Sequence, residues 1–186
     1  MSPVKPVFDP ANLYFITTSA VSRTKLFQPD EHKKILVDSL SYMHKEGWFR
    51  LHAFVIMPNH IHLLVRFVSP HNLANVMRDF KKFTAKKIAQ RIITSDDQHL
   101  LTIIETAGGW RGKSQYKIWE DGYDARDVFS VRFLEQKLDY IHNNPCQLQW
   151  RLVEQPVAYK WSSAAFYLVG RPAIIDIDDV REYLVG

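Results

Sequence analysis

Two apolar runs, residues 49–57 and 60–68, are separated only by Pro58 and Asn59. A two-residue connection leaves room only for a tight turn, so the runs predict two antiparallel strands joined as a hairpin. The other elements expected from the sequence lie on either side of this hairpin.

Residues 12–18 are rich in β-favouring side chains and predict a strand. A helix is expected to begin at Pro29-Asp30-Glu31 and to stop at Gly47. After the hairpin we expect a helix over 73–93, a loop over 95–114, a short strand over 115–119, a helix over 130–143 and a short helix over 176–184. This order indicates an α+β fold on the ferredoxin-like split β-α-β plan, an antiparallel sheet with an added C-terminal helix and extension.

The chain has 186 residues, 46% of them hydrophobic, which suits one domain with a real core. Residues 1–10 contain three prolines and are expected to form a loose lead-in, followed by a main domain over 11–150 and an extension over 151–186 that packs on it. No apolar stretch approaches the roughly 20 residues of a membrane span, so we expect a soluble cytoplasmic protein. Cys146, the single cysteine, is given no role.

The net charge of +4 merely permits a polyanionic partner, but the basic residues gather between 78 and 91. On the predicted helix, Leu73, Val76, Met77, Phe80, Phe83 and Ile88 form an apolar stripe, whereas Arg78, Lys82 and Lys86 recur every four residues on another side. If the chain binds nucleic acid, we predict that these three cations contact its phosphates, helped by Lys81 and by the loop residues Arg111 and Lys113. A merely solvated helix face is the alternative.

The second strand of the hairpin begins with a His-x-His motif, His60-Ile61-His62. Alternate side chains of a strand share a face, so the two imidazoles converge. Neutral imidazole is a good ligand of divalent metals, and two nitrogen ligands leave positions for an oxygen ligand and a phosphate. Taken alone, the motif is weak evidence for a metal site, because two ordinary histidines on a half-exposed strand would give the same pattern.

The helix over 130–143 carries an apolar stripe of Val131, Leu134, Leu138 and Ile141, and Tyr140 lies nearly opposite this stripe. Asn144, four residues on, projects from a similar side, so a hydroxyl and an amide oxygen could face the same metal. Most tyrosines simply pack or lie on the surface, and Asn before Pro is commonly just a helix stop. His142 sits nearer the stripe and is expected to be structural.

Several ordered motifs together carry a resemblance. They are the string from Ile56 to Leu64, the segment Trp119 to Tyr123, Tyr140-Ile141-His142-Asn143-Asn144-Pro145 and Trp161-Ser162-Ser163. In this order they resemble the motifs of the single-tyrosine HUH transposases, most closely those of the REP-associated tyrosine transposases. The similarity runs from about residue 13 to 167. Cys146 stands where family members often carry Val, which leaves the chemistry intact.

The resemblance implies that residues 11–150 are an HUH catalytic domain that cleaves and rejoins single-stranded DNA bearing a hairpin. It implies a divalent metal, Mg²⁺ or Mn²⁺, held by His60, His62 and Asn144, and Tyr140 as the nucleophile that forms a 5′-phosphotyrosine. Such an enzyme would work in the bacterial cytoplasm at the nucleoid, as a monomer or a homodimer.

Two other kinds of protein remain as alternatives. A binding-only protein would share the fold, for example a domesticated hairpin-binding protein without activity. RNA-recognition domains also use ferredoxin-like sheets, but their pattern K/R-G-F/Y-G/A-F-V does not occur in this sequence. A metal phosphohydrolase could use His-x-His to activate water, but it would not need Tyr140.

Overall fold

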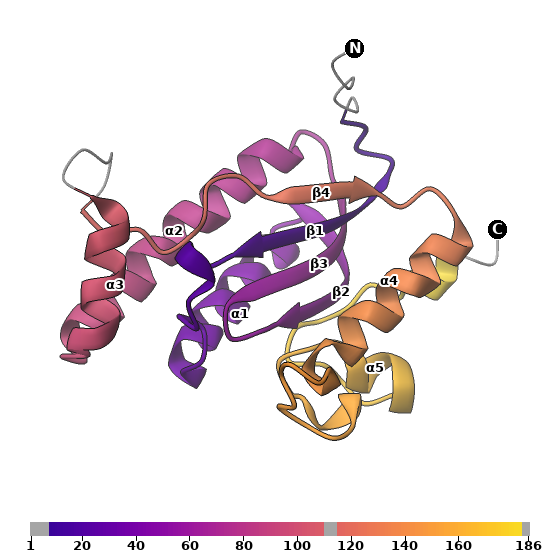
Figure 1. The fold of residues 1–186 in the computed structure, drawn as a ribbon. Coiled ribbons are helices and arrows are strands. Elements are labelled where there is room, and N and C mark those ends of the chain that lie inside the picture. Colours follow the sequence, from indigo (N-terminus) through magenta and orange to yellow (C-terminus); the bar gives the residue numbers. More distant parts are fainter. Residues whose placement is uncertain (1–7, 110–114, 184–186) are drawn as a thin grey trace, which may run out of the picture.

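The computed structural model describes residues 8–109 and 115–183. Its centre is an antiparallel four-stranded sheet in the order β2-β3-β1-β4, shown in Figure 1. The strands are β1 (Leu13–Ser19), β2 (Phe49–Ile56), β3 (His60–Phe67) and β4 (Asp124–Asp127). This strand order, with a helix after β1 and another after β3, is the ferredoxin-like plan, so the predicted α+β class is confirmed.

Helices α1 (Asp30–Lys45) and α2 (Leu73–Thr94) cover one face of the sheet (Figure 1). Ile16, Leu63 and Val65 point toward this side, where they meet the apolar side chains of both helices. Gly47 adopts a φ of +72°, a conformation that glycine takes without strain, and the chain turns there into β2. The expected helix stop is therefore confirmed.

The opposite face is partly covered by α4 (Val131–Asn143) and by the segment that follows it. Ser130 caps α4, its hydroxyl accepting a hydrogen bond from the backbone N–H of Phe133. Residues after 150 pack along the β2 edge, where the N–H of Ile56 donates to the carbonyl of Trp161 and the N–H of Ser163 to that of Phe54. A short helix, α5 (Ala164–Val169), follows these contacts.

Two elements differ from the sequence-based expectation. Residues 98–108 form a helix, α3 (Gln98–Gly108), rather than a loop, because the side chain of Asp97 caps it and Ile104 is buried on its inner side. The last strand is Asp124–Asp127 rather than 115–119. In the segment expected as a strand, Trp119 forms only an isolated β-bridge with Ala20, and its ring packs against that of Phe27.

Smaller corrections concern single side chains and turns. Phe83 and Val131, both expected in apolar stripes, are 50% and 53% exposed, because each lies off the side that its helix buries. The C-terminal helix expected over 176–184 is only a 3₁₀ turn, Val180–Tyr183, within the described residues. Other 3₁₀ turns are Val21–Arg23, Asn144–Cys146 and Pro156–Ala158.

Phe8, the first described residue, is partly buried and packs against the core. It stacks on Tyr14 with 5.4 Å between ring centroids and meets the edge of Phe67. Residues 1–7 of the lead-in expected over 1–10 lie outside the described residues. Within the described ranges, no helix combines the length and apolar character needed to cross a membrane.

Candidate active site

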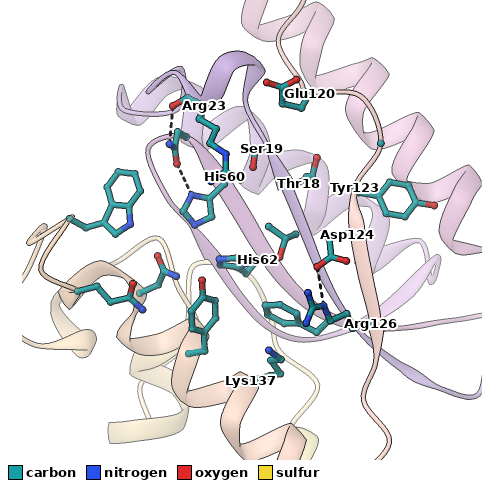
Figure 2. Close-up of a pocket in the computed structure, with 18 of the residues that line it drawn as sticks. Thr18, Ser19, Arg23, His60, His62, Glu120, Tyr123, Asp124, Arg126 and Lys137 are labelled. Carbon is teal, nitrogen blue, oxygen red and sulfur yellow. Dashed lines mark hydrogen bonds and ion pairs between the residues drawn. The ribbon is translucent and has the colours of Figure 1, made fainter. Parts of the chain in front are cut away.

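A cleft of about 930 Å³ opens on the sheet face that α1 and α2 leave uncovered. Strands β1, β3 and β4 form its floor, α4 forms one wall, and the segments around Glu120 and Trp150 complete its rim. Figure 2 shows His60, His62, Arg126 and Lys137 gathered around this space. The cleft therefore collects side chains that are far apart in the sequence.

His60 and His62 lie side by side on this face, with their ring centroids 4.7 Å apart. Each ring is oriented through its Nδ1 atom. His60 Nδ1 is 2.6 Å from Asn59 Oδ1, and the amide of Asn59 in turn donates to the carbonyl of Arg23. His62 Nδ1 is 2.8 Å from the hydroxyl of Thr17, its cross-strand partner on β1. When both Nδ1–H groups donate in these bonds, both Nε2 atoms carry a lone pair rather than a proton.

Both imidazoles are held in the neutral form. Burial lowers the pKa of His60 to about 4, with a further reduction by the charge of Arg23. Burial also lowers the pKa of His62 to about 3, helped by His60 and by the ammonium of Lys137. A neutral imidazole is the form that binds a metal, so at neutral pH neither ring needs to lose a proton first.

Asn144 lies at the end of α4, buried beside His60 and within hydrogen-bonding reach of it. Its Oδ1 atom is buried without a partner of good hydrogen-bond geometry, and so is His62 Nε2. Unpaired buried polar atoms are costly, which suggests that a ligand satisfies them. In the described part of the chain no three His, Cys, Asp or Glu side chains group as metal ligands, so the amide of Asn144 is the natural third donor.

Tyr140 reaches the same place from α4. Its ring lies 5.0 Å from the ring of His62 and 6.1 Å from that of Phe15, centroid to centroid. Although it touches both rings, it remains 40% exposed to the cleft, so a substrate can reach its hydroxyl. The prediction that Tyr140 is not a core residue of its helix agrees with this position.

His142 lies away from the cleft. It is buried, its Nε2 is 3.0 Å from the hydroxyl of Ser163, and burial lowers its pKa to about 4. This position agrees with the structural role expected for it, since the ring ties α4 to the C-terminal segment.

The cations expected to contact DNA are not part of this cleft. Arg78, Lys82 and Lys86 are exposed on α2, which packs on the other side of the sheet, and Arg78 pairs with Asp79. Lys81 donates to the carbonyls of Glu120 and Gly122, both at 2.6 Å, and so holds a segment of the cleft rim. Arg111 and Lys113 lie outside the described residues.

Three other cations line the cleft and were missed in the sequence. They are Arg23, Arg126 and Lys137. Lys137 could have been found, because it precedes Tyr140 by three residues and therefore shares its side of the helix. Arg23 and Arg126 come from a 3₁₀ turn and a four-residue strand, and no spacing rule links these elements to the histidines.

Comparison with known proteins decides the family. Residues 12–144 match the family model described as IS200-like transposase. The chain belongs to the IS200-like transposase family. The matched segment contains both strand histidines, Tyr140 and Asn144. Of the residues that line the cleft, only Gln147, Gln149 and Trp150 lie after it.

One solved structure of clearly similar fold supports the fold of this IS200-like transposase, and a second structure gives a weaker alignment. A structure described as a REP-associated tyrosine transposase bound to a REP hairpin aligns with a TM-score of 0.63 and 16% identity, covering 97% of this chain and 93% of the other. A Deinococcus radiodurans R1 protein described as a transposase aligns at 20% identity and a TM-score of 0.47, covering 77% and 94%. A search of curated proteins gave no match.

Proposed function

We propose that this transposase cleaves and rejoins single-stranded DNA beside a hairpin, with Tyr140 as the nucleophile and a divalent cation held by His60, His62 and Asn144. One observation carries the proposal. Tyr140 lies against His62 in an open cleft in which His62 Nε2 and Asn144 Oδ1 are buried and unpartnered. An exposed hydroxyl nucleophile therefore lies in one cleft with two buried atoms that could serve as metal ligands.

The donor set suits Mg²⁺ or Mn²⁺ with open positions. Two neutral imidazoles and one amide oxygen leave sites for water and for a phosphate oxygen, and the hydrogen bonds from Asn59 and Thr17 fix the two rings. When bound there, the cation would offset negative charge on the scissile phosphate.

Tyr140 would attack phosphorus through its hydroxyl oxygen. A new bond forms between this oxygen and phosphorus, and the bond between phosphorus and the 3′ oxygen breaks. The phenol loses its proton, and the leaving 3′ oxygen gains one. One phosphodiester replaces another, so the reverse reaction with a 3′-hydroxyl restores DNA without an external energy source.

The DNA substrate is proposed from two considerations. The solved structure of similar fold is described as bound to a REP hairpin. In this chain Arg23, Arg126 and Lys137 add positive charge around Tyr140, as expected for a cleft that accepts a phosphate backbone.

The test is incubation of the protein with hairpin-bearing single-stranded DNA from beside its gene, with Mn²⁺. Tyr140→Phe removes one oxygen and should abolish cleavage while DNA binding persists. Tyr123→Phe is the matched control, since Tyr123 lines the same cleft and is similarly exposed. Cleavage that survives in Tyr140→Phe would point to a hydrolase that activates water, and binding without cleavage by the parent would point to a protein that only binds hairpins.

A further inference from the structure

An exposed phenylalanine stands at the entrance to α4. Phe129 is 83% exposed, the highest value among the large hydrophobic side chains described. Its ring is stacked on that of Phe133, with 5.3 Å between centroids and 17° between planes. Only one face of Phe129 is covered in this way. A single exposed apolar side chain is common on protein surfaces, so a binding role has to follow from the side chains that lie beside this ring.

The side chains that follow Phe129 lead toward the nucleophile. Lys137 Nζ lies 4.9 Å from the ring centroid of Phe133, 4.6 Å from that of Phe15 and 5.7 Å from that of Tyr140. Phe133 and Lys137 are four residues apart on one helix and so share a side. We call Phe129, Phe133 and Lys137 the aromatic track. It runs from open solvent to the ring of Tyr140.

Positive charge accompanies this track. Lys137 has no carboxylate partner within ion-pair distance in the described part of the chain. Arg126, on β4, lies at the same end of the cleft as Lys137 in Figure 2 and also pairs with Asp124. A ring with an open face followed by a cation is the combination that binds an unpaired nucleotide chain, because bases stack on aromatic rings and phosphates pair with cations.

We propose that the aromatic track binds the unpaired DNA segment next to the scissile phosphate, with a base stacked on Phe129 and a backbone phosphate at Lys137. This inference rests on the proposed function, since it assumes that DNA reaches Tyr140. Phe133 supports the Phe129 ring from behind. The track would thus align the strand along α4 before cleavage.

The experiment measures affinity in the Tyr140→Phe background, where no DNA is consumed. Fluorescence anisotropy compares a hairpin alone with the same hairpin carrying an unpaired extension on its 5′ or its 3′ side. Phe129→Ala should weaken binding of one extended DNA roughly tenfold, the usual effect of losing one stacked base, and leave the hairpin alone unchanged. Phe129→Trp should retain the affinity, whereas Phe129→Leu, apolar but without a π face, should resemble Phe129→Ala.

Two further measurements separate stacking from charge. Abasic sites in the extension keep the phosphates but remove the bases, so they should erase the difference between the parent and Phe129→Ala. Phe129→Ala should leave the salt dependence of binding unchanged, while Lys137→Met should lower its slope by about 0.7, the value for one phosphate contact on a single strand.

Equal affinity of Phe129→Ala and the parent for both extended DNAs would overturn the proposal. An equal loss on the hairpin alone would also overturn it, and so would full affinity in Phe129→Leu. If light scattering shows that Phe129→Ala turns a dimer into a monomer, the exposed ring serves a second copy instead. A parent that neither binds nor cleaves hairpin-bearing DNA would refute the proposed function itself, whereas Tyr140-dependent cleavage with normal binding by the Phe129 variants would refute the track alone.

Discussion

The ring of Tyr140 lies 5.0 Å from that of His62, although the two residues are 78 positions apart and belong to a helix and a strand. The sheet fixes His62 through its pairing with Thr17, and α4 fixes Tyr140 above it. Because both elements are held by the core, the proposed nucleophile and the candidate metal ligand are already positioned without a bound substrate.

Thr17 should be needed for metal affinity although it is not itself a ligand. Thr17→Val keeps the shape of the side chain but removes the hydroxyl that orients His62, so we expect Mn²⁺ binding measured by calorimetry to weaken about 10–100-fold. Thr18→Val is the matched control, because the buried hydroxyl of Thr18 makes no hydrogen bond to any of the described residues. Equal effects of the two variants would show that the Thr17 hydroxyl does not orient a ligand.

Lys81 should matter for stability more than its neighbour on the helix. Lys81→Met removes two hydrogen bonds that a charged donor makes to the carbonyls of Glu120 and Gly122, and their loss should lower the free energy of unfolding by about 1–3 kcal/mol in urea titrations. Lys82 is exposed, so Lys82→Met should change the free energy of unfolding by less than about 0.5 kcal/mol. A Lys81→Met protein as stable as the parent would mean that these bonds do not hold the cleft rim.

Phosphate contacts by the cationic side of α2 can be tested through the salt dependence of DNA binding. If Arg78, Lys82 and Lys86 contact phosphates, replacing all three by Ala should lower the salt slope of single-stranded DNA binding by roughly 2, about 0.7 for each contact, and weaken all sequences about equally. The comparison is a triple variant of Arg23, Arg126 and Lys137, which line the cleft. An unchanged slope in the α2 variant, with a reduced slope in the cleft variant, would place the backbone contacts in the cleft.

Acid should destabilise the fold partly through His142. Burial lowers its pKa in the folded protein from 6.5 to about 4, so its contribution to stability is complete above pH 6.5 and is lost as the pH falls toward 4. Between pH 7 and pH 5 this loss should be about 2 kcal/mol. His142→Gln should flatten this part of the urea-derived stability profile, whereas His99→Gln, at an exposed position, should not. If the free energy of unfolding depends on pH in the same way for the parent and for His142→Gln, His142 does not contribute to the acid sensitivity.

Strong local patterns were enough to predict much of the fold. The two-residue turn at Pro58 and Asn59 set the hairpin, and strand alternation placed His60 and His62 on one face. The spacing of Tyr140 and Asn144 on a helix end put both in one cleft. These predictions worked because each depends on a period that the backbone itself imposes.

Other features depend on tertiary contacts that leave little local pattern. The strand Asp124–Asp127 consists mostly of charged residues, and it is a strand because it pairs with β1. Phe83 fits the apolar stripe of α2 by spacing, yet it is 50% exposed and the ammonium of Lys87 lies 5.9 Å from its ring centroid. The cations of the cleft come from three separate elements, so only the assembled sheet and α4 bring them together.

The most direct test of the proposed mechanism is to locate the covalent bond to DNA. The parent protein is incubated with hairpin-bearing single-stranded DNA and Mn²⁺, digested with protease and nuclease, and analysed by mass spectrometry. We expect a 5′-phosphonucleotide on the peptide that contains Tyr140, the same adduct in Tyr123→Phe, and none in Tyr140→Phe. An adduct on another residue, or cleavage by Tyr140→Phe at a rate comparable to that of the parent, would contradict the assignment of Tyr140 as the nucleophile.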